Sequence, residues 1–266
     1  MKVLVIPDIH GRKFWRNAIN NNIEKVDKII FLGDYLDPYQ NEIEENPELM
    51  ECEYFGDSKN LLKMLEDIIG LKKNEPDKYI LLTGNHSDSY IWSKFHAATR
   101  TDYKNWEKYH KVFSQNLEYF NLVWTENDTI FSHAGISEDW AKILCTRMDN
   151  KFESVLRTSK ILGAIPVDEI HNNDKLVSLL GQISYYRGGD YNHGSCEWAD
   201  LREYVDLEQS VFDIVPKGEE GIYQIFGHTQ VKQPLITDKW ACLDCRKAFI
   251  IDTKTHNIED ASNSSL

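Results

Sequence analysis

Five short polar motifs follow one another along this chain, and each comes directly after an apolar or β-branched run. They hold carboxylate, amide and imidazole groups, which are ligands for divalent metal ions. Polar residues that follow successive strands are predicted to converge along one edge of a sheet. The spacing therefore predicts a site for two metal ions at that edge. The motifs are Asp8-Ile9-His10-Gly11, Gly33-Asp34-Tyr35-Leu36-Asp37, Gly84-Asn85-His86, Ser132-His133-Ala134-Gly135 and Gly227-His228-Thr229.

The six candidate metal ligands differ in kind. Asp8 and His10 lie where the first apolar run ends, so both side chains can reach one point beyond the sheet. Asp34 follows Gly33, which allows a close backbone approach, and is the natural bridging carboxylate. An amide oxygen and two imidazoles would complete the shell of a second ion, and this mixture suits manganese, iron or zinc better than calcium. Those three ligands are Asn85, His133 and His228.

Each motif also has an ordinary structural interpretation. Asp8 can cap a helix, Asp34 and Asn85 can belong to plain turns, and a single histidine is commonly a buried core residue. Five such motifs at five successive strand ends favour the metal site.

Length, charge and cysteine content limit the classes of function. With 266 residues, one sizeable core with insertions is expected rather than two independent domains. A net charge of −13 and a pI near 5.1 disfavour extended nucleic acid, whereas two metal ions would attract a small phosphorylated ligand locally. No apolar run is long enough to cross a bilayer, so no membrane partner is expected. Five scattered cysteines favour a reducing, cytoplasmic location.

The elements that must position the motifs are predicted from apolar periodicity. Residues 2–7 and 28–32 are expected to form buried strands joined by a helix, and residues 79–82, 122–124 and 129–131 further strands. Helices are expected around residues 57–71 and 103–117. The C-terminal runs 222–226, 235–236, 241–243 and 249–251 are expected to add a second sheet. The acidic segment 41–54 is expected to be a solvated loop, and the tail from about residue 254 to fray.

The ordered motifs resemble those of the calcineurin-like metallophosphoesterase superfamily, nearest its phosphoprotein phosphatase and diadenosine tetraphosphatase branch. The resemblance implies an α/β fold, a four-layer α-β-β-α sandwich of two facing mixed sheets with the dinuclear metal site at the strand ends. It covers roughly residues 2–253, and residues 1–266 are expected to form a single domain with a cap or insertion at about 135–220. Gln230 stands where the phosphodiesterase branch has a second histidine.

Two departures from that branch concern phosphate binding. Pro38 and Tyr39 occupy the places of an arginine and a glycine, so one phosphate anchor is missing, and Ser87 stands where a glutamate is usual. Arg187, beside two tyrosines and two glycines, is the candidate replacement for substrate binding because arginine offers two donors at fixed geometry. A surface salt bridge is an equal alternative for Arg187, and Arg12 competes for the role.

The predicted enzyme is a cytoplasmic hydrolase that cleaves a phosphomonoester or a nucleotide polyphosphate. A hydroxide that bridges two divalent ions, manganese first with iron or zinc as alternatives, would attack phosphorus. His86 would protonate the leaving group as general acid, and the resemblance implies that Asp37 holds its tautomer. Its substrate would be a small phosphorylated molecule or a phosphoprotein. The alternatives are a phosphodiesterase of the same fold and a catalytically inactive interaction module.

Overall fold

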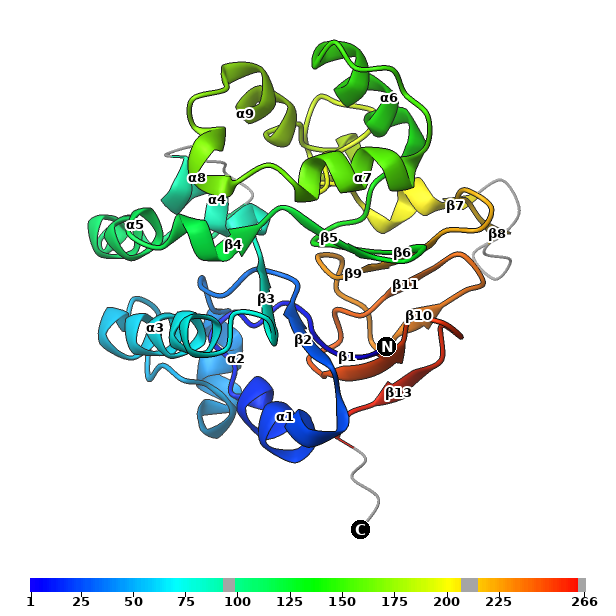
Figure 1. Cartoon of the computed structure of the whole chain (residues 1–266). Helices are drawn as coiled ribbons and strands as arrows, with labels where there is room; N and C mark the ends of the chain where they lie inside the picture. The colour runs from blue at the N-terminus through cyan, green and yellow to red at the C-terminus, as the bar shows by residue number, and fades with distance from the viewer. Residues whose placement is uncertain (93–98, 207–214, 263–266) are drawn as a thin grey trace. The chain divides into compact units, whose positions relative to one another are not determined.

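The computed structural model describes residues 1–92, 99–206 and 215–262. The chain divides into two compact units, residues 1–120 with 246–266 and residues 121–245, which are described separately. Each unit contains one mixed sheet with helices beside it (Figure 1). The segment 135–220 lies within the second unit, and its role as a cap on a single domain stays a prediction.

The first unit is built on a six-stranded sheet in the order β13-β12-β1-β2-β3-β4. Strands β1 (Lys2–Ile6), β2 (Lys28–Phe31) and β3 (Tyr79–Leu82) run parallel to one another. Their nearly continuous apolar runs are buried on both faces, as central parallel strands require. Helices α1 (Phe14–Asn22) and α3 (Ser58–Asn74) pack against β1 and β3 (Figure 1). This β-α-β order directs the ends of three parallel strands to one edge of the sheet.

The other elements of the first unit are short. They are η1 (Ile23–Lys25), α2 (Gln40–Glu45), η2 (Pro47–Leu49), α4 (Asn85–Ile91), α5 (Trp106–Ser114), η3 (Leu117–Tyr119), β4 (Phe120–Asn121, whose second residue falls in the other unit), β12 (Phe249–Asp252) and β13 (Ile258–Asp260).

The second unit is built on a five-stranded sheet in the order β10-β11-β9-β6-β5. Strand β6 (Thr129–Ser132) runs parallel to β9 (Tyr223–Phe226), which also runs parallel to β11 (Trp240–Cys242). Helix α7 (Val155–Gly163) packs on β5 (Val123–Glu126) and β6. The remaining elements are α6 (Glu138–Arg147), α8 (Val167–Ile170), α9 (Asp174–Leu180), η4 (Tyr185–Arg187), η5 (Leu201–Tyr204), β7 (Val205–Asp206), β8 (Val215–Pro216) and β10 (Leu235–Ile236).

Most of the predicted elements are present in the structure. The helix and strand signals correspond to α1, α3, α5 and the central strands, and the turn at residues 126–128 joins β5 and β6 as an antiparallel hairpin with Asn127 at positive φ. None of the helices in the described ranges combines the length and the apolar character needed to cross a membrane.

Three expectations were wrong. Strand β12 belongs to the first sheet, where it pairs antiparallel with β1, rather than to the second. The chain does not fray from residue 254, because residues 258–260 form β13 on β12; the last four residues lie outside the described part. The acidic segment 41–54 is not a plain solvated loop, since it contains α2 and its Glu42 and Glu51 pair with Arg12 and Arg16.

Candidate active site

Three motifs meet at the carboxyl ends of β1, β2 and β3 in the first unit. The loop after β1 hydrogen-bonds to the loop after β2, because the backbone N–H groups of Ile9 and His10 donate to the carbonyl of Asp34 at 3.1 and 2.8 Å. Asp8, His10, Asp34 and Asn85 are all buried in spite of their polarity. Burying polar side chains costs free energy unless they are paired, so their concentration at this edge marks it as a candidate site.

The backbone at this edge adopts conformations that ordinary residues avoid. His10, Asp34 and Asp37 all have positive φ, at 44°, 48° and 58°, and His228 in the second unit has 63°. These four candidates are half of the eight non-glycine residues with positive φ in the described ranges. Such conformations cost free energy and concentrate at functional sites. The local strain supports a role for these residues beyond the fold.

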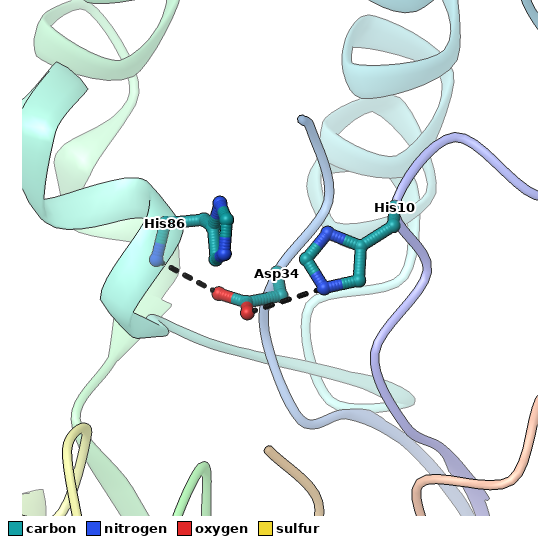
Figure 2. Close-up of side chains that lie close together, drawn as sticks. All are labelled: His10, Asp34 and His86. Atoms are coloured by element: carbon teal, nitrogen blue, oxygen red, sulfur yellow. Dashed lines mark hydrogen bonds and ion pairs between the residues drawn. The ribbon is translucent and has the colours of Figure 1, made fainter. Parts of the chain in front are cut away.

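His10 and Asp34 present two acceptor atoms to the same point. The Nδ1 of His10 donates to the carbonyl of Leu36 at 2.8 Å, which assigns the proton to that nitrogen and leaves the lone pair on Nε2. This Nε2 lies 3.5 Å from Oδ2 of Asp34 (Figure 2). Two ligands bound to one ion at about 2.1 Å each lie roughly 3.0–3.4 Å apart, so a divalent cation fits between them. Burial lowers the pKa of His10 well below its usual value, which favours the neutral, metal-binding imidazole.

His86 lies beside this pair, at the start of α4. Its backbone N–H donates to Oδ1 of Asp34 at 3.0 Å, and its ring centre is 4.8 Å from that of His10 (Figure 2). One ligand atom from each of His10, Asp34 and His86 falls within 4.8 Å of the other two. The predicted acid and two of the predicted ligands are thus brought together, and His86 is itself placed to reach an ion.

Asp37 is hydrogen-bonded to the ring of His86. Its Oδ2 accepts from Nδ1 of His86 at 2.8 Å, so Nε2 is the ring nitrogen that is not bound to Asp37. Tyr90, one helical turn after His86 on α4, donates to the other oxygen of Asp37. Burial raises the pKa of Asp37, although the hydrogen bonds from His86 and Tyr90 and the charge of Arg100 oppose the rise. This hydrogen bond is the contact that a tautomer-holding role of Asp37 requires, and that role stays a prediction.

Two residues of this site had been missed in the sequence. Tyr90 carried one signal, because it lies four residues after His86 and the two share a helix face. Arg100 carried none, since it belongs to no motif. Its Nε and Nη2 donate to the backbone carbonyl of Asp37 at 3.2 and 2.9 Å, and its guanidinium lies 3.4 Å from the ring centre of Tyr39.

The second unit brings its own two predicted ligands together. His133 follows β6 and His228 follows the parallel strand β9, and the N–H of Gly227 donates to the carbonyl of His133 at 2.8 Å. Nε2 of His133 lies 3.1 Å from Nδ1 of His228, a separation that suits two imidazoles on one ion. The expectation that all five motifs share one sheet edge was wrong, because three end strands of one sheet and two end strands of the other.

The arginines considered for phosphate binding are engaged elsewhere. Arg187 pairs with Asp200 at 2.8 Å and donates to Thr229 Oγ1 and the carbonyl of His228 at 2.7 and 3.0 Å, so it supports the loop that carries His228. Arg12 pairs with Glu42 and donates to the carbonyl of Asp8. A phosphate role for Arg187 stays a prediction, and the contacts of both arginines are those of positioning residues.

Solved structures of similar fold include two phosphatases. A cold-active protein-tyrosine phosphatase of a Shewanella species is 13% identical, with a TM-score of 0.57, over 98% of this chain and 80% of that one. A protein serine/threonine phosphatase of Saccharomyces cerevisiae, described as similar to human phosphatase PP5, is 16% identical, with a TM-score of 0.51, over 98% and 79%. At these identities the likeness shows the shared fold alone. A search of curated proteins gave no match.

The chain also matches the model of a protein family over most of its length. The family model of the calcineurin-like phosphoesterases matches residues 1–232, which include all five motifs. This range contains both ligand groups described above and the His86–Asp37 pair. The chain belongs to the calcineurin-like phosphoesterase family and is a hydrolase of phosphate esters.

Proposed function

We propose that the chain is a metal-dependent phosphatase of phosphomonoesters or nucleotide polyphosphates, with His86 as general acid. The observation that carries the proposal is the buried His86–Asp37 pair, 2.8 Å between Nδ1 and Oδ2, directly beside His10 and Asp34. An acid in this position can protonate a leaving oxygen on the same phosphorus that the metal ligands serve. The two phosphatases of similar fold support the monoester class.

The ligands proposed for two divalent ions are the six residues taken from the five motifs: Asp8, His10, Asp34, Asn85, His133 and His228. The carboxylate, amide and imidazole donors fit manganese, which we propose as the resident metal, with iron or zinc as alternatives. When bound, the ions supply Lewis-acid activation of water and neutralise the charge of the phosphoryl oxygens.

The protein's own groups then perform three tasks. Asp34 is held by the N–H of His86, so the candidate bridging carboxylate and the acid keep a fixed relation. Asp37 keeps the Nδ1 proton of His86 in place and stabilises the imidazolium, which transfers its Nε2 proton to the leaving oxygen. Burial excludes bulk water from these bonds and strengthens them. The five cysteines are scattered along the sequence and all are buried, which supports the proposed cytoplasmic location.

The test compares hydrolysis of p-nitrophenyl phosphate and bis(p-nitrophenyl) phosphate by manganese-loaded protein. We expect a strong preference for the monoester and loss of activity on chelation with EDTA. A preference for the diester would support the phosphodiesterase alternative instead. Hydrolysis of neither ester, with two ions bound, would contradict the proposal and favour the inactive interaction module.

A further inference from the structure

Arg100 is the one arginine of the first unit, in its described part, that forms no close ion pair with a carboxylate. The other three pair closely with carboxylates: Arg12 with Glu42, Arg16 with Glu51 and Asp67, and Arg246 with Glu42. For Arg100 the bonds are to the carbonyl of Asp37, and no carboxylate of the described ranges lies within 4.0 Å. Its guanidinium is partly buried. A partly desolvated cation with no close ion pair is stabilised when an anion binds to it.

The position of Arg100 is set by two residues of the second motif. The carbonyl of Asp37 accepts from Nε and Nη2, and the ring of Tyr39 lies 3.4 Å under the guanidinium carbon. Both restraints leave Nη1 without a hydrogen bond to the described residues. A guanidinium held flat by an aromatic ring loses little further entropy on binding and presents its remaining donors in a fixed direction.

The guanidinium also lies next to the reacting groups. Nη2 is 3.4 Å from Nδ1 of His10, a contact that is not a hydrogen bond because this nitrogen gives its proton to Leu36. Asp37 contacts both residues. Its backbone carbonyl accepts from Arg100, and its carboxylate accepts from Nδ1 of His86. Arg100 is therefore adjacent to one predicted metal ligand and to the acid pair at once.

We propose that Arg100 binds the phosphoryl oxygens of the substrate, with Tyr39 as its platform. The second motif has proline where the resembling branch has a phosphate-binding arginine, and Arg100 supplies a guanidinium to the end of that motif from a different segment. Its charge favours the dianion of a phosphomonoester over the monoanion of a diester. Arg100 is thus a determinant of monoester preference. The inference rests on the proposed function for the identity of its anion.

The experiment compares Arg100→Gln and Arg100→Lys with the control Arg16→Gln, whose arginine also lies over an aromatic ring but is paired with two carboxylates. Inhibition by inorganic phosphate is measured on the manganese-loaded full chain. For Arg100→Gln we expect the inhibition constant and KM for p-nitrophenyl phosphate to rise about 10- to 100-fold. The monoester-to-diester ratio should fall and the manganese content stay the same. Arg100→Lys should recover part of the affinity, and Arg16→Gln should match the wild type.

Two results would overturn the inference. One is a phosphate inhibition constant for Arg100→Gln within twofold of the wild type; the other is a loss of bound manganese, which would make Arg100 a structural support of His10. If the wild type hydrolyses neither ester, the proposed function fails. Calorimetric titration with phosphate then still tests whether Arg100 binds the anion. Binding to the wild type but not to Arg100→Gln would support the anion site, and equal or absent binding would refute it.

Discussion

His86 has two possible roles, because it lies both beside His10 and Asp34 and against Asp37. As a metal ligand it would use Nε2 to bind an ion; as a general acid it would use the same atom to hold a proton. The hydrogen bond from Nδ1 to Asp37 is compatible with either role, since carboxylates support both metal-bound and catalytic histidines.

Replacement of His86 by asparagine separates the two roles. We expect His86→Asn to keep its bound manganese and to lower kcat about 10²- to 10⁴-fold, the usual contribution of a general acid. The loss should be larger for an alkyl phosphate than for p-nitrophenyl phosphate, because a poorer leaving group needs the proton more. Manganese content and kcat for both esters measure this, with Asp34→Asn as the variant expected to lose metal. Equal metal loss in both variants would make His86 a ligand.

At this scale the residues predicted from sequence were those in motifs. The local sequence indicates the candidate ligands of the first unit, because each lies in a short motif directly after a predicted strand. These ligands are Asp8, His10, Asp34 and Asn85. The place of Arg100 was not predictable in this way, because it is set by a carbonyl 63 residues away in the sequence and by the ring of Tyr39. Such contacts are set by tertiary packing and leave no local pattern.

At the scale of elements, apolar runs predicted where strands form but not which strands pair. Residues 249–252 carry a strand pattern next to other C-terminal strands, yet β12 pairs with β1, with Lys2 opposite Asp252. Strand β1 pairs with β2 on one side, and on the other side it pairs with β12, which comes from the C-terminal part of the sequence. Pairing of distant segments depends on long-range contacts, and the local pattern does not contain that information.

Helix α3 packs against β3, and its N-cap residue, Asp57, has a titratable side chain. Asp57 accepts from the N–H of Asn60 at 3.3 Å and from that of Glu53 at 3.1 Å. Burial alone would raise the pKa of Asp57, but these hydrogen bonds and the Asn60 side chain lower it overall. A lowered carboxyl pKa means stability that is present above the unfolded value, near 3.9, and is lost as the pH falls through the folded value.

We therefore expect Asp57→Ala to lower the free energy of unfolding by about 1 kcal/mol at pH 7, the usual cost of an N-cap. The difference from the wild type should begin to shrink below about pH 4, where the carboxyl of the unfolded chain takes up a proton, and shrink further as the pH falls through the lower pKa of the folded state. Asp57→Asn is the matched control, because asparagine caps a helix without titrating. Urea unfolding at pH 7 and pH 3.5 measures both effects. An unchanged difference between Asp57→Ala and wild type at the two pH values would contradict the titration.

At the scale of the whole molecule, the negative net charge links metal binding to stability. The chain has a net charge of −13, and its first unit contains the buried carboxylates Asp8 and Asp34 at one sheet edge. Divalent ions that bind only the folded state stabilise it by mass action, and they also offset the charge of carboxylates brought together by folding. Metal binding should then be visible as stability as well as activity.

We expect manganese at about 100 times its dissociation constant to stabilise the wild type by about 2.7 kcal/mol for each ion bound. This corresponds to a rise in Tm of roughly 5–10 °C per ion for a chain of this size. Thermal unfolding with manganese and with EDTA measures the shift, and elemental analysis should give two ions per chain. Asp34→Asn should lose most of the shift, because the proposed bridging carboxylate serves both ions. A shift of the same size in Asp34→Asn would place the metal outside the β1–β2–β3 edge and would contradict the ligand set derived from the five motifs.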